Sequence, residues 1–325
     1  MKVGRLQIRP LRLCLVFCAL AVSSPTTARA SGPNLPPEAV RAMNKIYAGD
    51  SRGAIEILQE LERTQPENPV GFLLEAEADW WQIYCANSEV RYGMVDAWKR
   101  GKKAEDENYL TLVDKVIFLA EAQIAKSDTA EMRLYAGNGY ALKARIYALR
   151  GESRAVAHAG VAARAEFLRA LELDPQMADA TGGLGLYNYY VDSLSSAVKV
   201  LRFFMGIPGG DRKEGIRQMQ IAIDRGVISQ VEMRFYLAKG LRNFDQEYAQ
   251  AVAVADPLVA SYPRNFVFQL LLGNLNTELG RTEKASGHFH AAVQAADTNQ
   301  RDCSTCSSCK THVHGIVDSF FAEHH

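Results

Sequence analysis

A 34-residue pattern near the C-terminal end constrains the fold of this chain more than any other feature. The segment that begins at Asn265 reads NFVFQLLLGNLNTELGRTEKASGHFHAAVQAADT. Its small and large apolar positions are Leu272, Gly273, Gly280, Ala285, Phe289 and Ala292. A small residue lets two antiparallel helices cross closely, and the large residues fill the gaps beside it. The pattern therefore predicts a helical hairpin that stacks on similar hairpins to form a solenoid.

Related but less regular units precede this one. The first lies at about residues 37–68 and ends in a Pro-x-Asn-Pro turn, and a second spans about 136–175 and ends in LELDP. A third unit begins at Ala178, and a fourth runs from Val231 to Pro263. Residues 70–135 are expected to be helical but fit the repeat poorly. Long period-two runs of β-formers are missing, so the sequence predicts an all-α chain.

Two of these units depart from the regular length. The second has seven extra residues, which either lengthen its second helix or form a loop around Gly160. In the third, an insert at 192–211 replaces the regular turn. We expect a short amphipathic helix there, with Asp211 capping the helix that follows. A phosphate-binding loop at Gly209-Gly210 is disfavoured, because the Walker lysine and a preceding strand are both missing.

The repeats resemble those of the tetratricopeptide-repeat superfamily over most of 37–297, with specific matches at 37–68, 140–175 and 265–297. The resemblance implies a right-handed solenoid of antiparallel helix hairpins that binds a protein or peptide through its concave face. Residues 182–226 also resemble a segment of the eukaryotic inclusion-body clearance family of tetratricopeptide proteins. The matching residues are Ser193, Leu194, Gly210, Asp211, Arg212 and Gly215. This second resemblance implies a shared sub-architecture and a scaffolding role.

Residues 1–30 have the composition of a signal peptide. Basic residues precede an apolar stretch from Leu11 to Val22, and Ala28-Arg29-Ala30 supplies the small residues of a cleavage site. We expect cleavage after Ala30, an exported protein that is periplasmic or secreted, and association with the cell envelope. An uncleaved anchor helix is the alternative. A lipoprotein at Cys18 fits less well, because bulky Phe17 precedes that cysteine.

The charge balance argues against a nucleic-acid partner. The whole chain has 37 basic and 37 acidic residues, but the first 30 residues hold five of the basic ones and no acidic one. Residues 31–325 therefore carry a net charge of −5. A nucleic-acid groove needs a basic surface.

Aromatic residues supply the candidate partner-binding positions, which are Trp80, Trp81, Tyr187, Tyr190, Phe203 and Phe204. Adjacent tryptophans on a helix cannot both point into one narrow seam, so one of Trp80 and Trp81 is expected to be exposed or to lie under a loop, and an exposed one would be an anchor for a peptide. Tyr187 and Tyr190 share a helix face. Core packing is the competing interpretation for all six residues.

The C-terminal segment 300–325 carries the candidate metal ligands Cys303, Cys306, Cys309 and His312. Thiolates and imidazole bind zinc or iron–sulfur clusters. Against this, the four residues lie within ten positions of a Ser/Thr-rich segment, and export favours disulfides. We expect a flexible tail with an opportunistic disulfide after a solenoid that spans 31–299, and the two alternatives are a metal site and another redox role. Four cysteines remain after residue 30, and their pairing stays open.

The sequence offers no convincing catalytic site, since the GxSxG, HExxH and Walker motifs are missing. We therefore expect a non-enzymatic scaffold without a resident cofactor. One alternative is a metal-binding or redox accessory protein that uses the C-terminal segment. Another is a periplasmic accessory of a transport system that binds a small ligand in an apolar cavity of the solenoid.

Overall fold

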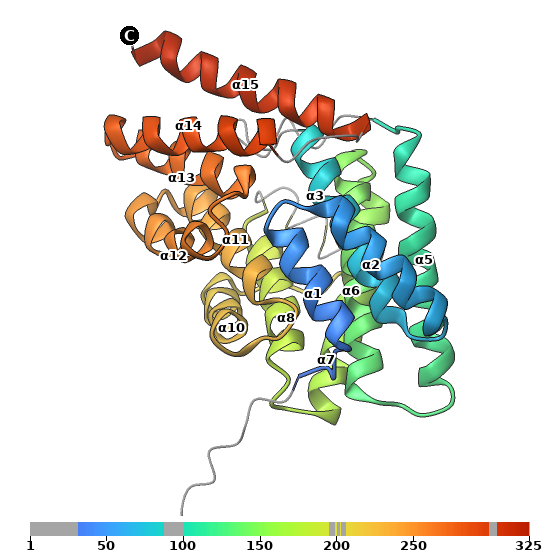
Figure 1. Cartoon of the computed structure of the whole chain (residues 1–325). Helices are drawn as coiled ribbons and strands as arrows, with labels where there is room; N and C mark the ends of the chain where they lie inside the picture. Colours follow the sequence, from blue (N-terminus) through green and yellow to red (C-terminus); the bar gives the residue numbers. More distant parts are fainter. Residues whose placement is uncertain are drawn as a thin grey trace, which may run out of the picture.

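The computed structural model describes residues 32–87, 101–194, 199, 202, 206–298 and 304–324. These residues form α-helices, one short π-helical segment and the turns between them, with no strand in the described ranges. The all-α, tetratricopeptide-like solenoid predicted from the sequence is confirmed (Figure 1). Within the same ranges, no helix is long and apolar enough to cross a membrane.

Successive helices pack against one another as antiparallel neighbours along the chain. The helices of the N-terminal half are α1 (Pro37–Tyr47), α2 (Ser51–Thr64), α3 (Pro69–Asn87), α5 (Glu105–Ile124), α6 (Ala130–Leu149) and α7 (Ser153–Leu173). Those of the C-terminal half are α8 (Ala178–Asp192), α10 (Arg212–Arg225), α11 (Gln230–Gly240), the π-helical segment η1 (Leu241–Asp245), α12 (Tyr248–Ser261), α13 (Phe266–Glu278), α14 (Thr282–Thr298) and α15 (Ser304–His324).

The 34-residue pattern forms the hairpin of α13 and α14, packed as the sequence predicts. A Cβ atom added to Gly273 would lie 2.6 Å from the Phe289 ring, so this ring needs a glycine opposite it. The same arrangement recurs at Phe167. A Cβ atom added to either Gly137 or Gly183 would lie within 2.6 Å of the Phe167 ring. Small residues on one helix thus accommodate a ring from the next, which sets the close crossing of each pair.

The two departures from the repeat also have described structure. The extra residues near Gly160 lengthen α7, which continues without interruption from Ser153 to Leu173. Asp211 caps α10 as predicted, because its Oδ1 atom accepts a hydrogen bond of 2.9 Å from the backbone N–H of Glu214. The short helix predicted over Leu194–Phe204 falls mostly outside the described residues.

The helices differ in how many of their faces are buried. Helix α2 buries one stripe, formed by Ala54, Leu58 and Leu61. Helix α13 buries ten consecutive residues from Val267 to Asn276. A helix that is buried all round lies in the interior, whereas one with a single apolar stripe lies on the surface. We therefore call α3, α6, α8, α11 and α13 the inner helices.

The solenoid curves until its first helix meets its later ones. The side-chain amide of Asn265, at the start of α13, donates a 2.9 Å hydrogen bond to the backbone carbonyl of Tyr47, at the end of α1. The Tyr47 and Tyr262 rings lie 5.8 Å apart. Figure 1 shows α1 between the N-terminal helices and the pair α12–α13. This closure brings inner helices from distant parts of the chain into contact.

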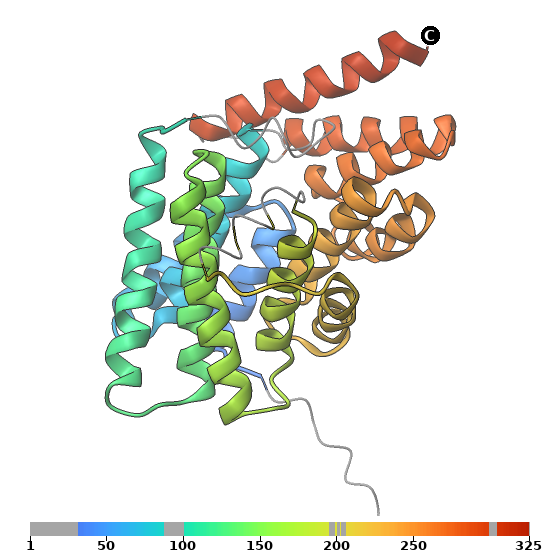
Figure 2. The same cartoon turned by 180° about the vertical axis from the view of Figure 1, so that it is seen from behind.

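The flexible tail expected at 300–325 is wrong for the part that the structure describes. Residues 304–324 form α15, which packs across α14 and α3 (Figure 2). Val313, Ile316, Val317 and Phe320 are buried. Their i, i+3, i+4, i+7 spacing is that of an amphipathic helix, and the Phe320 and Phe289 rings lie 4.5 Å apart. The apolar stripe thus predicts the structure of this segment better than its Ser/Thr-rich start does.

Candidate functional site

A buried charge cluster lies where the inner helices meet. Arg145 of α6 forms ion pairs with Glu77 of α3, at 3.2 Å, and with Glu232 of α11. All three side chains are largely buried. Arg145 thus forms ion pairs with carboxylates of two helices, α3 and α11, that are far apart in the sequence. Burying these charges costs desolvation energy, and this cost is offset only when the charged groups form close ion pairs and hydrogen bonds.

Aromatic side chains enclose this cluster. The Arg145 guanidinium lies 5.1 Å from the Tyr236 ring centroid and 5.7 Å from that of Trp80. The indole N–H of Trp80 donates a 3.0 Å hydrogen bond to the Tyr236 hydroxyl, and that of Trp81 donates one of 2.8 Å to Glu77. These two nearby rings favour arginine over lysine at this position, through cation–π contacts.

The cluster contains one arginine and two glutamates, so the pKa of Glu77 depends strongly on its neighbours. Burial raises the pKa of Glu77, and the nearby carboxylate of Glu232 raises it further, while Arg145 opposes both effects. Arg145 remains a cation. The two glutamates therefore compete for one counter-ion in a medium that disfavours a net charge.

The structure places the predicted partner-binding residues differently from the expectation. Trp80 is 3% and Trp81 6% exposed, so the prediction that one tryptophan is an exposed anchor is wrong. The physical reason is the closure of the solenoid: α11 covers one face of α3, and α13 places Phe268 against Trp81, with ring centroids 5.7 Å apart.

The tyrosine pair is divided between two environments. Tyr190 is half-buried and packs edge-on against Phe244, with ring centroids 5.9 Å apart. Tyr187 is half-buried on the other side, where its hydroxyl donates a 2.9 Å hydrogen bond to the carbonyl of Pro208. Phe203 and Phe204 lie outside the described residues. Both tyrosines thus contact other residues of the chain, and partner binding by them stays a prediction.

A small pocket with a volume of about 20 Å³, room for about one water molecule, lies beside the buried cluster, on residues that the sequence analysis missed. It lies on α3, α11, η1 and α13, and its lining residues are Tyr84, Phe235, Lys239, Arg242, Asn243, Val267, Leu271 and Asn274. The lining contains apolar side chains, two cations and two amides. In the sequence, Lys239 and Arg242 are two of many charged residues on helices, and no local pattern marks them as a pair.

Lys239 is unusual because it is a lysine that is 5% exposed. Burial lowers its pKa to about 7, and the Arg242 guanidinium lowers it further. Its ammonium nitrogen lies 4.9 Å from the centroid of the Tyr84 ring. Arg242 donates a 2.8 Å hydrogen bond to Asn243 and pairs with Glu278 at 3.3 Å. The pocket therefore holds a lysine whose charge changes near neutral pH.

A second titrating group lies between α2 and α3. Burial raises the pKa of Glu62 to about 8, and a hydrogen bond with Glu75 adds to the shift. Burial, followed by the charge of Glu75, raises the pKa of Asp79 to about 6. Glu75 also accepts a 3.2 Å hydrogen bond from Gln59. The raised pKa values of Glu62 and Asp79 make this helix contact sensitive to pH.

Replacing Glu62 by glutamine is expected to stabilise the protein by about 1 kcal/mol at pH 8, a value reduced for the half-exposed position of this side chain. The folded pKa lies above the unfolded one, so ionisation of Glu62 costs stability as pH rises from about 4.5 to 8. A neutral amide removes that cost. Urea unfolding between pH 4.5 and 8 should show a gain that grows with pH, whereas Glu56→Gln, at an exposed position on α2, should change stability by less than about 0.5 kcal/mol.

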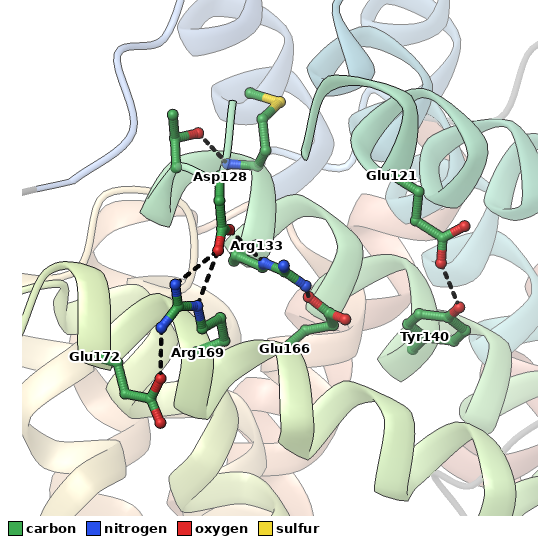
Figure 3. A network of polar contacts seen from close by, with 9 residues as sticks. Glu121, Asp128, Arg133, Tyr140, Glu166, Arg169 and Glu172 are labelled. Carbon is green, nitrogen blue, oxygen red and sulfur yellow. Dashed lines mark hydrogen bonds and ion pairs between the residues drawn. The ribbon is translucent and has the colours of Figure 1, made fainter. Parts of the chain in front are cut away.

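The outer surface carries an ion-pair network on α6, α7 and the turn before α6 (Figure 3). Arg133 contacts Asp128 at 2.7 Å and Glu166 at 2.9 Å. Arg169 contacts Asp128 and Glu172, both at 2.8 Å. Hydrogen bonds from the two arginines hold the pKa of Asp128 below its usual range. These pairs are accessible to water and join neighbouring helices, which is a structural role.

The C-terminal segment contains a disulfide between Cys85 of α3 and Cys309 of α15. Cys303 lies outside the described residues, and His312 lies on α15. A site that combined Cys303, Cys306, Cys309 and His312 would require this disulfide to be reduced, because a bonded sulfur is not a thiolate ligand. Zinc or iron–sulfur binding by these residues therefore remains a prediction. No group of three or more metal-ligating side chains occurs in the residues that were described.

Comparison with known proteins gives two kinds of match. Residues 244–300 match a family model described as a tetratricopeptide repeat. Among solved structures, the C-terminal part of a TPR repeat-containing protein from Cytophaga hutchinsonii is 12% identical, with 88% of each chain covered and a TM-score of 0.38. None of the curated proteins matches. The family match falls on the most regular hairpins, α12 to α14, so this part of the chain is similar to a tetratricopeptide repeat.

Proposed function

We propose that this protein is an exported scaffold that binds an acidic segment of a protein partner through the pocket on its inner helices. The observation that carries the proposal is the lining of that pocket, where Lys239, Arg242, Asn243 and Asn274 converge beside apolar side chains. Cations and amide N–H groups together recognise carboxylates, through charge-assisted hydrogen bonds. The pocket has a volume of about 20 Å³, so a carboxylate enters only if the lining side chains move apart, and Phe235, Val267 and Leu271 would then contact the side chain that carries it.

The closed interior supports this placement of the site. Trp80, Trp81 and Arg145 are engaged with the chain's own side chains, so a long peptide would have to displace a packed core. A short acidic side chain or terminal carboxylate needs less room. Binding in the pocket would add a negative charge beside the buried Lys239 and favour its protonated form.

Binding is expected to depend on pH through Lys239. With a pKa of about 7 in the free protein, the fraction of charged lysine falls about tenfold between pH 6 and pH 8. The affinity for a peptide with two glutamates and a free C-terminus should fall about tenfold over this interval, measured by isothermal titration calorimetry. The complex should take up protons near pH 7, seen as a dependence of the measured heat on the ionisation enthalpy of the buffer.

Lys239→Met is expected to weaken this binding at pH 6 and to remove its pH dependence. The matched control is Lys213→Met, which removes an exposed lysine of α10. Equal binding of the peptide and its amidated, glutamine-substituted form would contradict recognition of a carboxylate. If Lys213→Met and Lys239→Met behave alike, the pocket is not the binding site.

The disulfide between Cys85 and Cys309 supports the export part of the proposal, because disulfides persist in oxidising compartments. Fractionation of a Gram-negative host that expresses the full chain is expected to place it in the periplasm, with Ser31 at its N-terminus. A cytoplasmic chain that retains residues 1–30 would contradict export.

A further inference from the structure

Two arginines outside the ion pairs described above lie close to Tyr187. The guanidinium carbon of Arg164, on α7, lies 5.6 Å from the centroid of the Tyr187 ring. Arg202 donates a 3.4 Å hydrogen bond from Nη1 to the carbonyl of Ile207, and the Tyr187 hydroxyl donates one of 2.9 Å to the next carbonyl, that of Pro208. Tyr187 therefore contacts the first arginine and also the turn that holds the second.

The backbone fixes Arg202 relative to this turn. The N–H of Ile207 donates a 3.1 Å hydrogen bond to the carbonyl of Arg202, and Gly206 has a φ of 66°. These two features are typical of the Schellman motif that ends helices. A Cβ atom added to Gly209 would lie 3.1 Å from Nη1 of Arg202, so the glycine leaves room for the guanidinium against the turn.

Neither Arg164 nor Arg202 forms an ion pair with any residue that the structure describes. Both side chains are half-buried, and the Nε atom of each is buried without a hydrogen-bond acceptor. Burying a charge without a partner is costly, so charged side chains removed from water are normally paired. Burial raises the pKa of Tyr187 and both arginines oppose that rise, which places the two cations near one ring. The described part of the chain thus supplies two neighbouring positive charges and no counter-ion.

We propose that Arg164 and Arg202 bind a phosphate group, free or as a monoester, beside the turn of residues 206–210. A guanidinium presents its N–H groups in a fork that matches phosphate oxygens, and two guanidinium groups balance the charge of a dianion. Arg164 comes from α7 and Arg202 from the segment before α10. Tyr187 is a positioning residue, because its ring contacts Arg164 while its hydroxyl holds the turn.

The charge of the site favours phosphate over a carboxylate. A single carboxylate would pair with one guanidinium and leave the other without a counter-ion. A phosphate monoester carries about 1.5 to 2 negative charges at pH 7, which matches both arginines. The site is not of the Walker type, since its cations come from two separate segments rather than from one loop.

The phosphate site is separate from the pocket that contains Lys239. That pocket is lined by residues of α3, α11, η1 and α13, whereas the two arginines belong to α7 and to the segment before α10. Failure of one proposal therefore leaves the other standing. Bound phosphate would join α7 to the turn at 206–210, so we expect it to protect the backbone of this turn.

The test is isothermal titration calorimetry of the full chain with inorganic phosphate, at constant ionic strength, with acetate as the singly charged comparison. We expect phosphate to bind at least about tenfold more tightly than acetate. Arg164→Gln and Arg202→Gln should each weaken phosphate binding by about tenfold or more, because each removes charge-assisted hydrogen bonds. Glycerol 3-phosphate distinguishes the sources: tighter binding than that of inorganic phosphate indicates a monoester, and weaker binding indicates free phosphate.

The matched control is Arg154→Gln, which removes an exposed arginine of α7 and should leave the affinity unchanged. Arg164→Lys keeps the charge without the fork and should keep part of the affinity. Equal weakening by Arg154→Gln and Arg164→Gln would overturn the site, as would equal affinities for phosphate and acetate. Hydrogen exchange of residues 206–211 in the unmodified protein should slow when phosphate is added. Unchanged exchange there would overturn the proposal whether or not the variants fold.

Discussion

Replacing Arg145 by methionine is expected to lower the free energy of unfolding by about 3–5 kcal/mol, measured by urea denaturation at pH 7. Methionine has a similar length and can pack between the rings of Trp80 and Tyr236. The loss therefore comes from Glu77 and Glu232, which would remain buried without their shared counter-ion. Removing one partner of a buried ion pair costs more than the pair itself contributes.

The pH dependence separates this explanation from a packing defect. Without Arg145, the pKa of Glu77 in the folded state should lie further above the unfolded value of about 4.3, because Arg145 is the group that opposes its rise. The cost is then present at neutral pH and disappears as pH falls toward that unfolded value. The difference from the unmodified protein should shrink between pH 7 and pH 5.

Two comparisons complete the experiment. Arg169→Met removes an arginine from the exposed network of Figure 3 and should cost less than about 1 kcal/mol, because surface pairs contribute little. Adding Glu77→Gln and Glu232→Gln to Arg145→Met should restore part of the lost stability. A loss that is independent of pH, and that the two glutamines do not reduce, would contradict the role given to the cluster.

The regular hairpin is the part of the fold that the sequence predicts well. Gly273 and Phe289 lie 16 positions apart, and their contact depends on only two helices and one turn. The same holds for Asp211, whose capping role is local to the first turn of α10. Features that depend on one hairpin leave a pattern within about 34 residues, and that pattern is readable from a single sequence.

The candidate site depends on contacts that leave no such pattern. Trp80 and Tyr236 are 156 positions apart and meet because the solenoid curves back on itself. Curvature is the sum of small rotations between successive hairpins, so it cannot be inferred from any one of them. For the same reason, Glu77 and Arg145 resemble charges on solvated helix faces when the sequence is considered alone.

The helix α15 is a different case, because its signal is present in the sequence. Val313, Ile316, Val317 and Phe320 have helical spacing, and Cys309 precedes them by one turn. The Ser/Thr-rich start and the cysteine spacing favour a tail with ligands, whereas the periodicity of the apolar residues indicates an amphipathic helix. The described structure shows the stripe buried against its neighbours.

Removing the disulfide by Cys85→Ala and Cys309→Ala is expected to lower the stability of the protein by about 2–4 kcal/mol. The bond closes a loop of 224 positions, and in the chain-entropy model long loops restrict the unfolded state most. The measured stabilisation by a disulfide is often smaller than the chain-entropy model predicts. Helix α15 also keeps its contact with α14 when the bond is absent, so we expect a loss below the value from that model.

The effect should be concentrated at α15, which without the bond can open separately from the rest of the solenoid. Hydrogen exchange of residues 304–324 is expected to accelerate while that of α6 and α11 stays unchanged at low denaturant. Reduction of the unmodified chain with a phosphine should reproduce this result without altering packing at either position, and Cys303→Ala is the matched control. Uniform acceleration along the whole chain would contradict a local role, because it would mean that the disulfide stabilises the solenoid as one cooperative unit and that α15 is part of its core.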